Sequence, residues 1–282
     1  MEDAMTLCRD HGVARNYLCV GKSGTGKSTI KDMMRIHHPD SVQQNGLRMP
    51  ILAVDTPALP TMKNFAEAIL IKLNDPCYGR GTAMEKTARI TNFVQQCGVE
   101  LIIFDELQHF VDQGRSKSHM MVADWMKSLL DGVSVPTVLM GLERSAELLK
   151  VNEQLRRRFS QRLPLEAFDF DDDKDRGNFI GVMTNLLECF HEYPQIELSN
   201  VEAVKRLHFA TNGVIDAMVR LLIATYEIVE HRKVQVIDPD LLAEAFRIGI
   251  WAEAPHNHNP FHKSFKWKRL DQPGMPFHEV LS

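Results

Sequence analysis

The stretch Gly21-Lys22-Ser23-Gly24-Thr25-Gly26-Lys27-Ser28 decides the fold of this chain. It fits the pattern G-x-x-x-x-G-K-[ST] at every position, and it lies between a short apolar run at Tyr17–Val20 and a helical pattern from Lys27 to about His38. In such a loop, glycines let successive backbone N–H groups converge on phosphate oxygens, and the N-terminus of the helix adds its positive end. We therefore expect a strand–loop–helix unit whose phosphate-binding residues are Gly21, Lys22, Ser23, Gly24, Thr25, Gly26, Lys27, Ser28 and Thr29.

A second stretch, Leu101-Ile102-Ile103-Phe104-Asp105-Glu106, is an apolar run that ends in two acids. A buried strand of this kind delivers its carboxylates to the edge of the sheet where the phosphates lie. The two stretches together indicate an ATP site. In it, Lys27 reaches the β- and γ-phosphates and Ser28 and Asp105 hold Mg²⁺, with Asp105 acting mostly through water. Glu106 is placed to polarise the attacking water as a general base. The Asp-Glu pair favours a hydrolase over a small-molecule kinase, because a kinase must keep water from being activated.

The rest of the chain indicates an α/β fold followed by helices. Further short apolar runs alternate with helical patterns, which is typical of a parallel sheet with crossover helices, here five-stranded. The runs are Ile51–Asp55, Thr137–Gly141 and Leu163–Leu165, and the helical patterns are Met62–Leu73, Thr82–Cys97 and Val122–Leu130. Beyond the acidic stretch Asp169–Asp173 only helices are expected, at 172–191, 199–211, 214–231 and 239–249. The expected parts are an α/β nucleotide-binding core (1–168), an all-helical lid (169–250) and an extended aromatic-basic tail (251–282).

Composition excludes several classes of protein. Hydrophobic residues make up 44% and charged residues 25% of the 282 residues, as in an ordinary globular chain, so disordered and fibrous classes are excluded. The net charge of −4 speaks against a protein that coats nucleic acid by bulk charge, although a local basic surface remains compatible with it. The five cysteines form no C-x-x-C pair, which argues against a zinc ribbon or a disulfide framework. No secretory signal and no apolar run of about 18 residues is present, so we expect a cytoplasmic protein without a membrane partner.

An arginine cluster, Leu155-Arg156-Arg157-Arg158-Phe159, lies between the fourth and fifth expected strands. An arginine supplied by a neighbouring subunit can stabilise the charge on the γ-phosphate. Arg158, just before the apolar Phe159, is the first candidate for this role and Arg156 is the second. The alternative is a solvated basic end of a helix.

These motifs resemble those of the AAA+ ATPases and, within them, the TniB/TnsC family of transposition regulators. The resemblance covers about residues 10–250, and it rests on Gly21–Ser28, Leu101–Phe110, Thr137–Ser145 and Asn152–Phe159, followed by an all-helical lid with Asn212-Gly213. The first two stretches are common to P-loop ATPases with a catalytic glutamate, whereas the others point to the narrower family. Relatives usually carry a longer arm before the loop that here begins at Gly21.

The resemblance implies a function in DNA transposition. Such proteins bind ATP and Mg²⁺ and assemble as hexameric or heptameric rings, or as helical filaments, around double-stranded DNA. They link target selection, through a TniQ-type protein, to a DDE transposase in the bacterial cytoplasm. They supply regulation and not strand transfer.

A DNA-binding oligomer needs a basic inner stripe. Candidates are Lys86 and Arg89, which lie three apart and so share a helix face, and Arg115 and Lys117 in the loop after the Asp-Glu strand. Their contacts would be to phosphates and largely independent of sequence. The alternative is that all four are ordinary solvated charges.

Two departures from the family pattern put efficient hydrolysis in doubt. Gly141-Leu142 stands where many relatives have a threonine or asparagine sensor, which leaves Glu143 as the nearest polar residue. Ala217 stands where the lid often carries a sensor arginine, and Arg220 lies about one helical turn further on. The departures favour a protein in which ATP is more an assembly signal than a fuel.

Two other functions remain open at this level. One is a different AAA+ protein, such as a replication initiator or helicase loader, and the other is a nucleotide-switched binding module with negligible turnover. The tail is also open to two interpretations. Its aromatic and basic residues either dock on a partner such as a transposase or pack back on the lid; they are Trp251, Phe261, Lys263, Phe265, Lys266, Trp267, Lys268 and Arg269.

Overall fold

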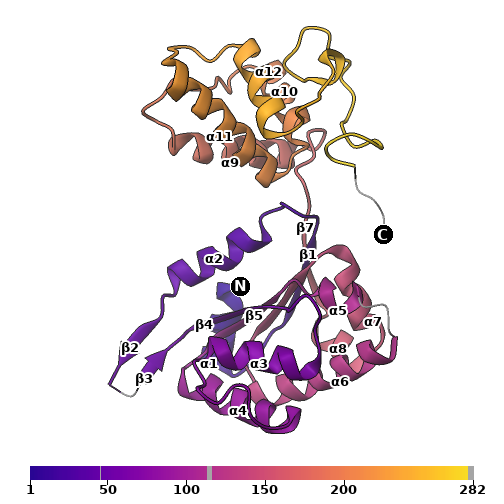
Figure 1. Cartoon of the computed structure of the whole chain (residues 1–282). Helices are drawn as coiled ribbons and strands as arrows, with labels where there is room; N and C mark the ends of the chain where they lie inside the picture. Colours follow the sequence, from indigo (N-terminus) through magenta and orange to yellow (C-terminus); the bar gives the residue numbers. More distant parts are fainter. Residues whose placement is uncertain (45, 113–115, 279–282) are drawn as a thin grey trace. The chain divides into compact units, whose positions relative to one another are not determined.

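The computed structural model of the chain describes residues 1–44, 46–112 and 116–278, without the side chains of residues 116–119. Two compact units make up the fold, residues 1–165 and 166–282 (Figure 1). The boundary falls three residues before the expected one, because the last strand of the sheet ends at Leu165 and the chain leaves the α/β unit there.

The first unit is built on a five-stranded parallel sheet, which confirms the predicted fold class. The strands lie in the order β4-β5-β6-β1-β7, and they are β1 (Tyr17–Gly21), β4 (Ile51–Asp55), β5 (Leu101–Asp105), β6 (Thr137–Gly141) and β7 (Gln161–Leu165). Register aligns Asp55 with Asp105 and Gly21 with Leu165. The carboxyl ends of the strands therefore meet at one edge of the sheet, where the candidate residues also lie.

Both faces of the sheet are covered by helices. Alternate residues of β1 and β5 enter different apolar clusters, with Leu18 and Phe104 on one face and Cys19 and Ile103 on the other, as the period of two in a strand requires. Helices α3 (Met62–Lys72), α4 (Ala83–Gln96) and α6 (Ser116–Val133) cover the first face, and α1 (Glu2–His11) and α2 (Lys27–His37) cover the second (Figure 1). Short helices follow β5 and β6: α5 (Gln108–Asp112), the 3₁₀ turn η1 (Glu143–Ala146), α7 (Glu147–Lys150) and α8 (Glu153–Arg158).

Two elements of this unit were not expected from the sequence. Helix α1 precedes the first strand and inserts Ala4 and Met5 into the cluster beneath the sheet. An antiparallel pair, β2 (Ser41–Gln43) and β3 (Gly46–Arg48), follows α2. The strands of this pair are three residues long and mostly exposed, so their side chains carry no burial pattern that would predict them.

The second unit is helical in its described residues. It contains α9 (Asp173–Glu188), α10 (Val201–Thr211), α11 (Ile215–Arg232), α12 (Pro239–Gly249) and the 3₁₀ turn η2 (His256–His258). The side chains of Asp172, Asn200 and Asp238 cap the N-termini of three of these helices. Because aspartate and asparagine oxygens accept the free backbone N–H groups of a first turn, these residues fix where each helix begins.

The segment after α12 differs from the expected extended tail. Phe261, Phe265 and Leu270 are buried in the same apolar cluster as the four helices, and the Asn259 side chain donates to the backbone oxygen of Ala243 at 2.8 Å. The sequence allowed two interpretations of the tail, docking on a partner or packing on the lid. The described residues of the tail pack on the helices. The regularly spaced apolar side chains explain this, because burying them removes their surface from water.

Within the described ranges, no single helix is both long and apolar enough to cross a membrane. Helices α10 and α11 reach that length and composition only as a pair, and the pair is bent by 108°.

Candidate active site

The loop between β1 and α2 depends on its glycines. Gly24 and Gly26 have φ angles of 77° and 95°, a region that favours glycine. A Cβ atom on Gly21 would lie 2.1 Å from the backbone oxygen of Leu165, so no side chain fits at the start of the loop. Helix α2 begins at Lys27 without a side-chain cap, which leaves its first N–H groups for a ligand. The loop has the conformation that a phosphate cradle requires.

The Lys27 side chain is folded across this loop. Its Nζ donates to the backbone oxygens of Gly21 (2.8 Å) and Lys22 (2.6 Å), and only 9% of the residue is exposed. Burial lowers the pKa of Lys27, while the nearby Asp105 opposes that shift. Ser28 and Thr29, at the start of α2, are exposed beside it. The ammonium group is therefore at the phosphate loop, held by backbone oxygens that a phosphate would replace.

Asp105 ends β5 in a buried position, as the sequence predicted. Its residue is 1% exposed, its Oδ1 accepts from the backbone N–H of Glu106 at 2.8 Å, and its Oδ2 accepts from Lys31 Nζ at 2.8 Å. Lys31 Nζ also reaches Asp55 Oδ1 at 2.6 Å. Burial lowers the pKa of Lys31, but the bonds to Asp105 and Asp55 outweigh that effect, and the net shift is upward.

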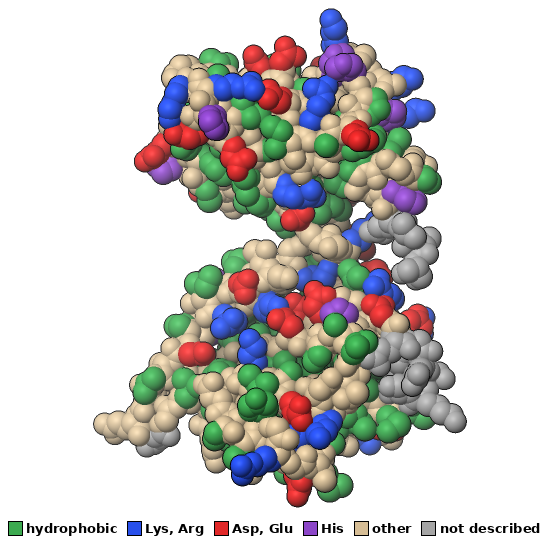
Figure 2. Space-filling model, in the orientation of Figure 1, with side chains coloured by type: hydrophobic (Ala, Val, Ile, Leu, Met, Phe, Trp, Pro, Cys, Tyr) green, Lys and Arg blue, Asp and Glu red, His purple; other side chains and the backbone are tan. Residues whose placement is uncertain are grey.

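Lys31 was missed by the sequence reasoning, although a signal was available. It lies four residues after Lys27 on the same helix, and residues at this spacing share a helix face. The ends of β4 and β5 together with this face bring two carboxylates and two ammonium groups to one edge of the sheet. Figure 2 shows red and blue side chains gathered along the upper edge of the α/β unit in that view.

Glu106 is held by a residue that the sequence reasoning did not single out. Gln108 Nε2 donates to Glu106 Oε2, and Gln108 Oε1 accepts from the backbone N–H of Leu142 at 3.1 Å. Gln108 is 5% exposed, and Glu106 itself has a φ of 57°. The amide group thus joins the end of β5 to the end of β6. Its place two residues after the glutamate was the signal in the sequence.

The two atypical sensor positions carry no polar side chain in the structure either. Leu142 contributes its backbone N–H to Gln108, and Ala217 is fully buried in α11. Arg220 pairs with Asp216 at 2.8 Å and donates to the backbone oxygen of Gly249 at 3.0 Å, both within the helical unit. Gln108 is consequently the buried polar side chain that contacts the predicted general base.

The arginine cluster is divided among different contacts. Arg158 forms an ion pair with Asp131, and Arg157 pairs with Glu153 at 2.7 Å. Arg156 is exposed and has no ion-pair partner among the residues that the structure describes. Of the two candidates for a role in a neighbouring subunit, Arg156 is the one with an uncommitted guanidinium group.

Lys86 is buried and so does not fit the predicted DNA contact, and the partly exposed Arg89 is engaged by the loop before α4. The Lys86 side chain is fully buried, where Nζ donates to the backbone oxygens of Tyr78 and Arg80. Arg89 donates to Asp75 Oδ2 at 2.9 Å and to the backbone oxygen of Cys77 at 2.9 Å. The prediction that they share a helix face holds, but that face binds the loop before α4 and not a phosphate backbone.

The other two DNA candidates are not described by the structure. Arg115 lies outside the described residues, and so does the side chain of Lys117.

The residues at the sheet edge fit ATP with Mg²⁺. The glycine cradle, the uncapped helix N-terminus and the Lys27 ammonium group suit phosphate oxygens, and the Ser28 hydroxyl and the Asp105 carboxylate are oxygen donors of the kind that Mg²⁺ prefers. No group of three histidines, cysteines or acids suited to a metal occurs in the part of the chain that the structure describes. A nucleotide-bound Mg²⁺ does not need one, because phosphates and water supply most of its ligands.

This fold and this site define a P-loop ATPase of the AAA+ class. The protein-family model described as bacterial TniB protein matches residues 1–168 of this sequence. The chain therefore belongs to the TniB family. No curated protein matches the chain.

Several solved structures have a similar fold. The Aeropyrum pernix Orc2 protein in its ADPNP–ADP complexes is similar with a TM-score of 0.62 at 12% identity, over 90% of this chain and 67% of that one. Pyrobaculum aerophilum Cdc6p has a TM-score of 0.61 at 10% identity, over 86% and 64%. The Thermotoga maritima RuvB branch-migration motor has a TM-score of 0.53 at 15% identity, over 88% and 66%. The chain thus spans about two thirds of their length, and at these identities the likeness shows the fold.

Proposed function

We propose that this protein is an ATP-dependent, DNA-binding regulator of transposition that assembles on duplex DNA. The observation that carries the proposal is the joint presence, at one sheet edge of a TniB-family chain, of the phosphate loop, the buried Asp105 and the Gln108-bound Glu106. The loop supports nucleotide binding, and the Asp-Glu pair supports hydrolysis. Family membership supports a role in transposition.

The site suggests how its residues act. The loop N–H groups and the N-terminus of α2 bind the phosphates. The Lys27 ammonium group then donates to phosphate oxygens in place of the backbone oxygens of Gly21 and Lys22. Ser28 and Asp105 hold Mg²⁺, which neutralises phosphate charge when bound. Glu106, oriented by Gln108, takes the proton of the attacking water. Arg156 stabilises the phosphate charge at a neighbouring subunit, and Arg158 is the second candidate.

DNA and partner proteins belong to the same proposal. Among the similar structures is an Aeropyrum pernix Orc1 protein in complex with DNA, which supports the use of this fold on DNA (TM-score 0.55, 15% identity, 86% of this chain and 62% of that one). We expect a homo-oligomer, either a hexameric or heptameric ring or a helical filament, that receives a TniQ-type target selector and signals to a DDE transposase. Its place is the bacterial cytoplasm, on DNA.

Assembly is the first test. Full-length protein with an ATP analogue and duplex DNA is expected to form rings or filaments in negative-stain electron micrographs, and Lys27→Ala is expected to remove them. Glu106→Gln is expected to assemble normally and to release no phosphate from ATP. Only monomers with both ligands present would overturn the proposal.

The trans-acting arginine has its own test. Arg156→Ala is expected to spare nucleotide binding while weakening assembly or turnover, and Arg158→Ala serves as the comparison because its side chain is already paired with Asp131. Loss of nucleotide binding in Arg156→Ala would contradict a role in the neighbouring subunit.

Two alternatives rest on specific observations. The Orc and Cdc6 likeness favours an initiator or helicase loader, which would act with a replicative helicase and not with a transposase. The apolar sensor positions, Leu142 and Ala217, favour a nucleotide-switched module with negligible turnover. Phosphate release measured with and without DNA separates that module from an ATPase.

A further inference from the structure

The C-terminal segment contains a stretch whose charged side chains are all of one sign. Residues 254–270 contain no aspartate or glutamate, but they hold Lys263, Lys266, Lys268 and Arg269 together with three histidines. The segment is therefore locally positive in a protein whose net charge is −4. A local run of this kind creates an attractive field for a polyanion regardless of the net charge.

The structure fixes the backbone of this segment and leaves its lysines in water. Phe261 and Phe265 are buried among the helices, whereas Lys263, Lys266 and Lys268 between and after them are exposed. Within the described ranges these three ammonium groups have no ion-pair partner, in contrast to Arg269, which lies 3.5 Å from Asp169. A ligand would therefore meet cations on an ordered backbone that do not first have to leave a carboxylate.

Trp267 lies between Lys266 and Lys268 in the sequence and has an unusual backbone conformation. It is 39% exposed and has a φ of 54°, a region that a bulky residue rarely adopts. The Arg206 guanidinium lies 4.8 Å and the Lys205 ammonium 5.4 Å from the centre of the indole ring. The ring of Phe209 contacts the indole edge-on, and the ring of Phe265 is tilted against it. The surroundings thus hold the indole partly exposed beside Arg206 and Lys205 on a strained backbone, and such strain often marks a functional position.

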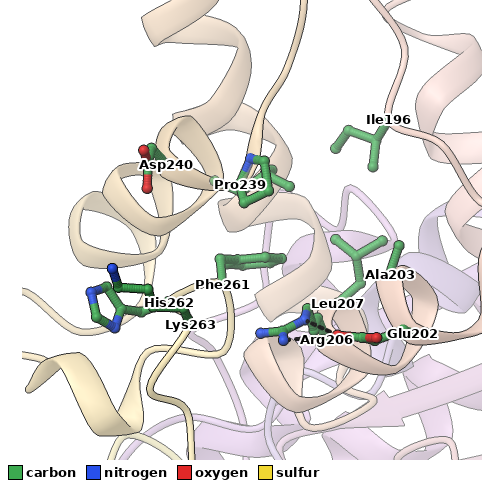
Figure 3. A pocket seen from close by; sticks show the side chains of 11 residues that line it. Ile196, Glu202, Ala203, Arg206, Leu207, Pro239, Asp240, Phe261, His262 and Lys263 are labelled. Carbon is green, nitrogen blue, oxygen red and sulfur yellow. Dashed lines mark hydrogen bonds and ion pairs between the residues drawn. The ribbon is translucent and has the colours of Figure 1, made fainter.

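A cavity next to this segment is lined by side chains of both charge signs. This cavity of about 560 Å³ is lined by Arg206 and Lys263, but also by Glu202 and Asp240, and Glu202 accepts from Arg206 at 2.9 Å (Figure 3). Burial, followed by His256 and Lys263, lowers the pKa of His262 on its wall, so that residue adds little positive charge near neutral pH. The cavity is mixed in sign, whereas Lys266 and Lys268, on either side of Trp267 in the sequence, do not line it and have no ion-pair partner among the described residues.

We propose that this surface binds the sugar-phosphate backbone of DNA. It consists of Lys205, Arg206, Lys263, Lys266, Trp267 and Lys268 and is called the tail surface below. Exposed lysines match phosphates, and an exposed aromatic ring among them matches a base or sugar, a combination typical of sequence-tolerant nucleic-acid binding. The choice of DNA rests on the proposed function. The tail surface lies within the helical unit, so its contact with DNA does not require ATP.

The test measures DNA binding by the full chain without nucleotide. A variant with Lys263→Gln, Lys266→Gln and Lys268→Gln is titrated onto a fluorescein-labelled duplex of arbitrary sequence at several salt concentrations. We expect weaker binding and a salt dependence whose slope falls by about 0.9 for each phosphate that the variant no longer neutralises. The control, Lys63→Gln, Lys72→Gln and Lys174→Gln, removes three exposed lysines elsewhere and has the same net charge. An unchanged slope in the first variant, or an equal loss of affinity in both, overturns the proposal.

Trp267 gives a second, independent measurement. DNA is expected to quench tryptophan fluorescence in the unmodified protein, and Trp267→Phe, which keeps an aromatic ring against Phe209 and Phe265, is expected to lose most of that quenching. Undiminished quenching in Trp267→Phe overturns the proposal, and so does quenching by an acidic polypeptide of equal charge that matches quenching by DNA.

Failure of the tail surface to bind DNA can be distinguished from failure of the proposed function. The lysine variant retains the phosphate loop, so it is expected to bind nucleotide normally. If the unmodified protein fails to assemble with ATP and DNA, the proposed function fails, while the nucleotide-free salt slope still tests the tail surface.

Discussion

Lys31 is a built-in cation between two carboxylates. Its ammonium group contacts both Asp55 and Asp105, and only 14% of its side chain is exposed. Asp105 is also the proposed Mg²⁺ ligand, so Lys31 neutralises part of the charge that would attract a free metal ion. The arrangement favours metal binding together with nucleotide, whose phosphates supply further negative charge, over metal binding alone.

Replacing this lysine tests that argument. In Lys31→Met the two aspartates lose their shared cation, and the affinity for Mn²⁺ without nucleotide is expected to rise by on the order of tenfold, about 1.4 kcal/mol. Electron paramagnetic resonance of free Mn²⁺ measures it, with Lys72→Met as an exposed control. Equal Mn²⁺ affinity in Lys31→Met and the unmodified protein would show that Lys31 does not neutralise the metal site.

Gln108 is expected to position the general base without binding nucleotide. Gln108→Ala removes the donor to Glu106 and leaves the backbone N–H of Leu142 without its acceptor. We expect kcat for ATP hydrolysis to fall about tenfold, less than the roughly 100-fold or greater loss typical of removing a general base, while KM for ATP stays within about twofold. Gln108→Glu, which keeps the acceptor but not the donor, is the comparison. A rise in KM alone would assign Gln108 to substrate binding.

The sequence predicted the site residues whose chemistry depends on local geometry. The loop at Gly21–Ser28 and the acid at the end of β5 follow from a strand, a turn and a helix in order, and the structure has Lys27 at the loop and Asp105 buried beside it. Lys31 and Gln108 escaped prediction because their partners come from other strands, β4 and β6. Lys86 was misinterpreted because a charge pattern on a helix does not show which side faces the core.

Helix α4 shows what that core-facing lysine does. Besides the backbone oxygens of Tyr78 and Arg80, Lys86 Nζ lies 3.2 Å from Glu67 Oε1 of α3. Arg89, one turn on, binds Asp75, which is 5% exposed. The two cations therefore attach the loop between α3 and α4 to the helix pair.

A methionine at position 86 is expected to destabilise the protein without affecting DNA. Lys86→Met leaves buried carbonyl oxygens without a donor, which costs about 2–3 kcal/mol in the free energy of unfolding. Urea denaturation followed by Trp125 fluorescence measures it, because Trp125 is buried in the same unit and donates to Thr87 Oγ1 at 2.9 Å. Weakened DNA binding at unchanged stability would restore Lys86 as a DNA contact.

His208 makes the stability of the helical unit depend on pH. It is 5% exposed in α10, its Nε2 lies 2.7 Å from the backbone oxygen of Phe168, and burial lowers its pKa from 6.5. The folded state therefore favours neutral His208, and the unfolded state binds more protons at low pH. The contribution of His208 to the free energy of unfolding is fully present above pH 6.5, and it is lost as the pH falls through the pKa of His208 in the folded state.

The expected outcome is a helical unit that weakens as the pH falls below 6.5, by roughly 1.4 kcal/mol for each unit of pKa shift. Denaturation at several pH values measures this, and His208→Gln, which can still donate to Phe168 but does not titrate, is expected to flatten the dependence. An identical pH profile in His208→Gln would assign the effect to another group.

Helices and strands with strong apolar periods were predictable, and those without were not. The helices from α9 to α12 and the five strands of the sheet follow their spacing of apolar residues. The β2–β3 pair has too few buried side chains to produce a pattern. The packing of residues 251–278 depends on complementary surfaces in α10 and α12, which no local pattern encodes.

At the scale of the whole molecule, the two units have separate apolar cores. A ligand that binds only the folded α/β unit stabilises that unit by mass action, by about 2.7 kcal/mol at 100 times its dissociation constant. In a variant with Trp251→Phe and Trp267→Phe, Trp125 remains as the sole tryptophan, since the chain contains three. ATP analogue is expected to raise the denaturation midpoint reported by Trp125, and Lys27→Ala is expected to abolish the shift. A shift that persists in Lys27→Ala would contradict binding at the phosphate loop.

The pairing of Gly21 with Leu165 brings the start of the phosphate loop against the main chain that leads into the second unit. The first residue of the phosphate loop packs against the backbone of the last residue of β7 without room for a side chain, and the second unit begins at the next residue, Glu166. A displacement at Gly21 therefore has to be accommodated by the backbone of Leu165, directly before the second unit begins. The start of the phosphate loop and the start of the second unit are thus joined by one close backbone contact, which is a property of the main chain and not of any side chain.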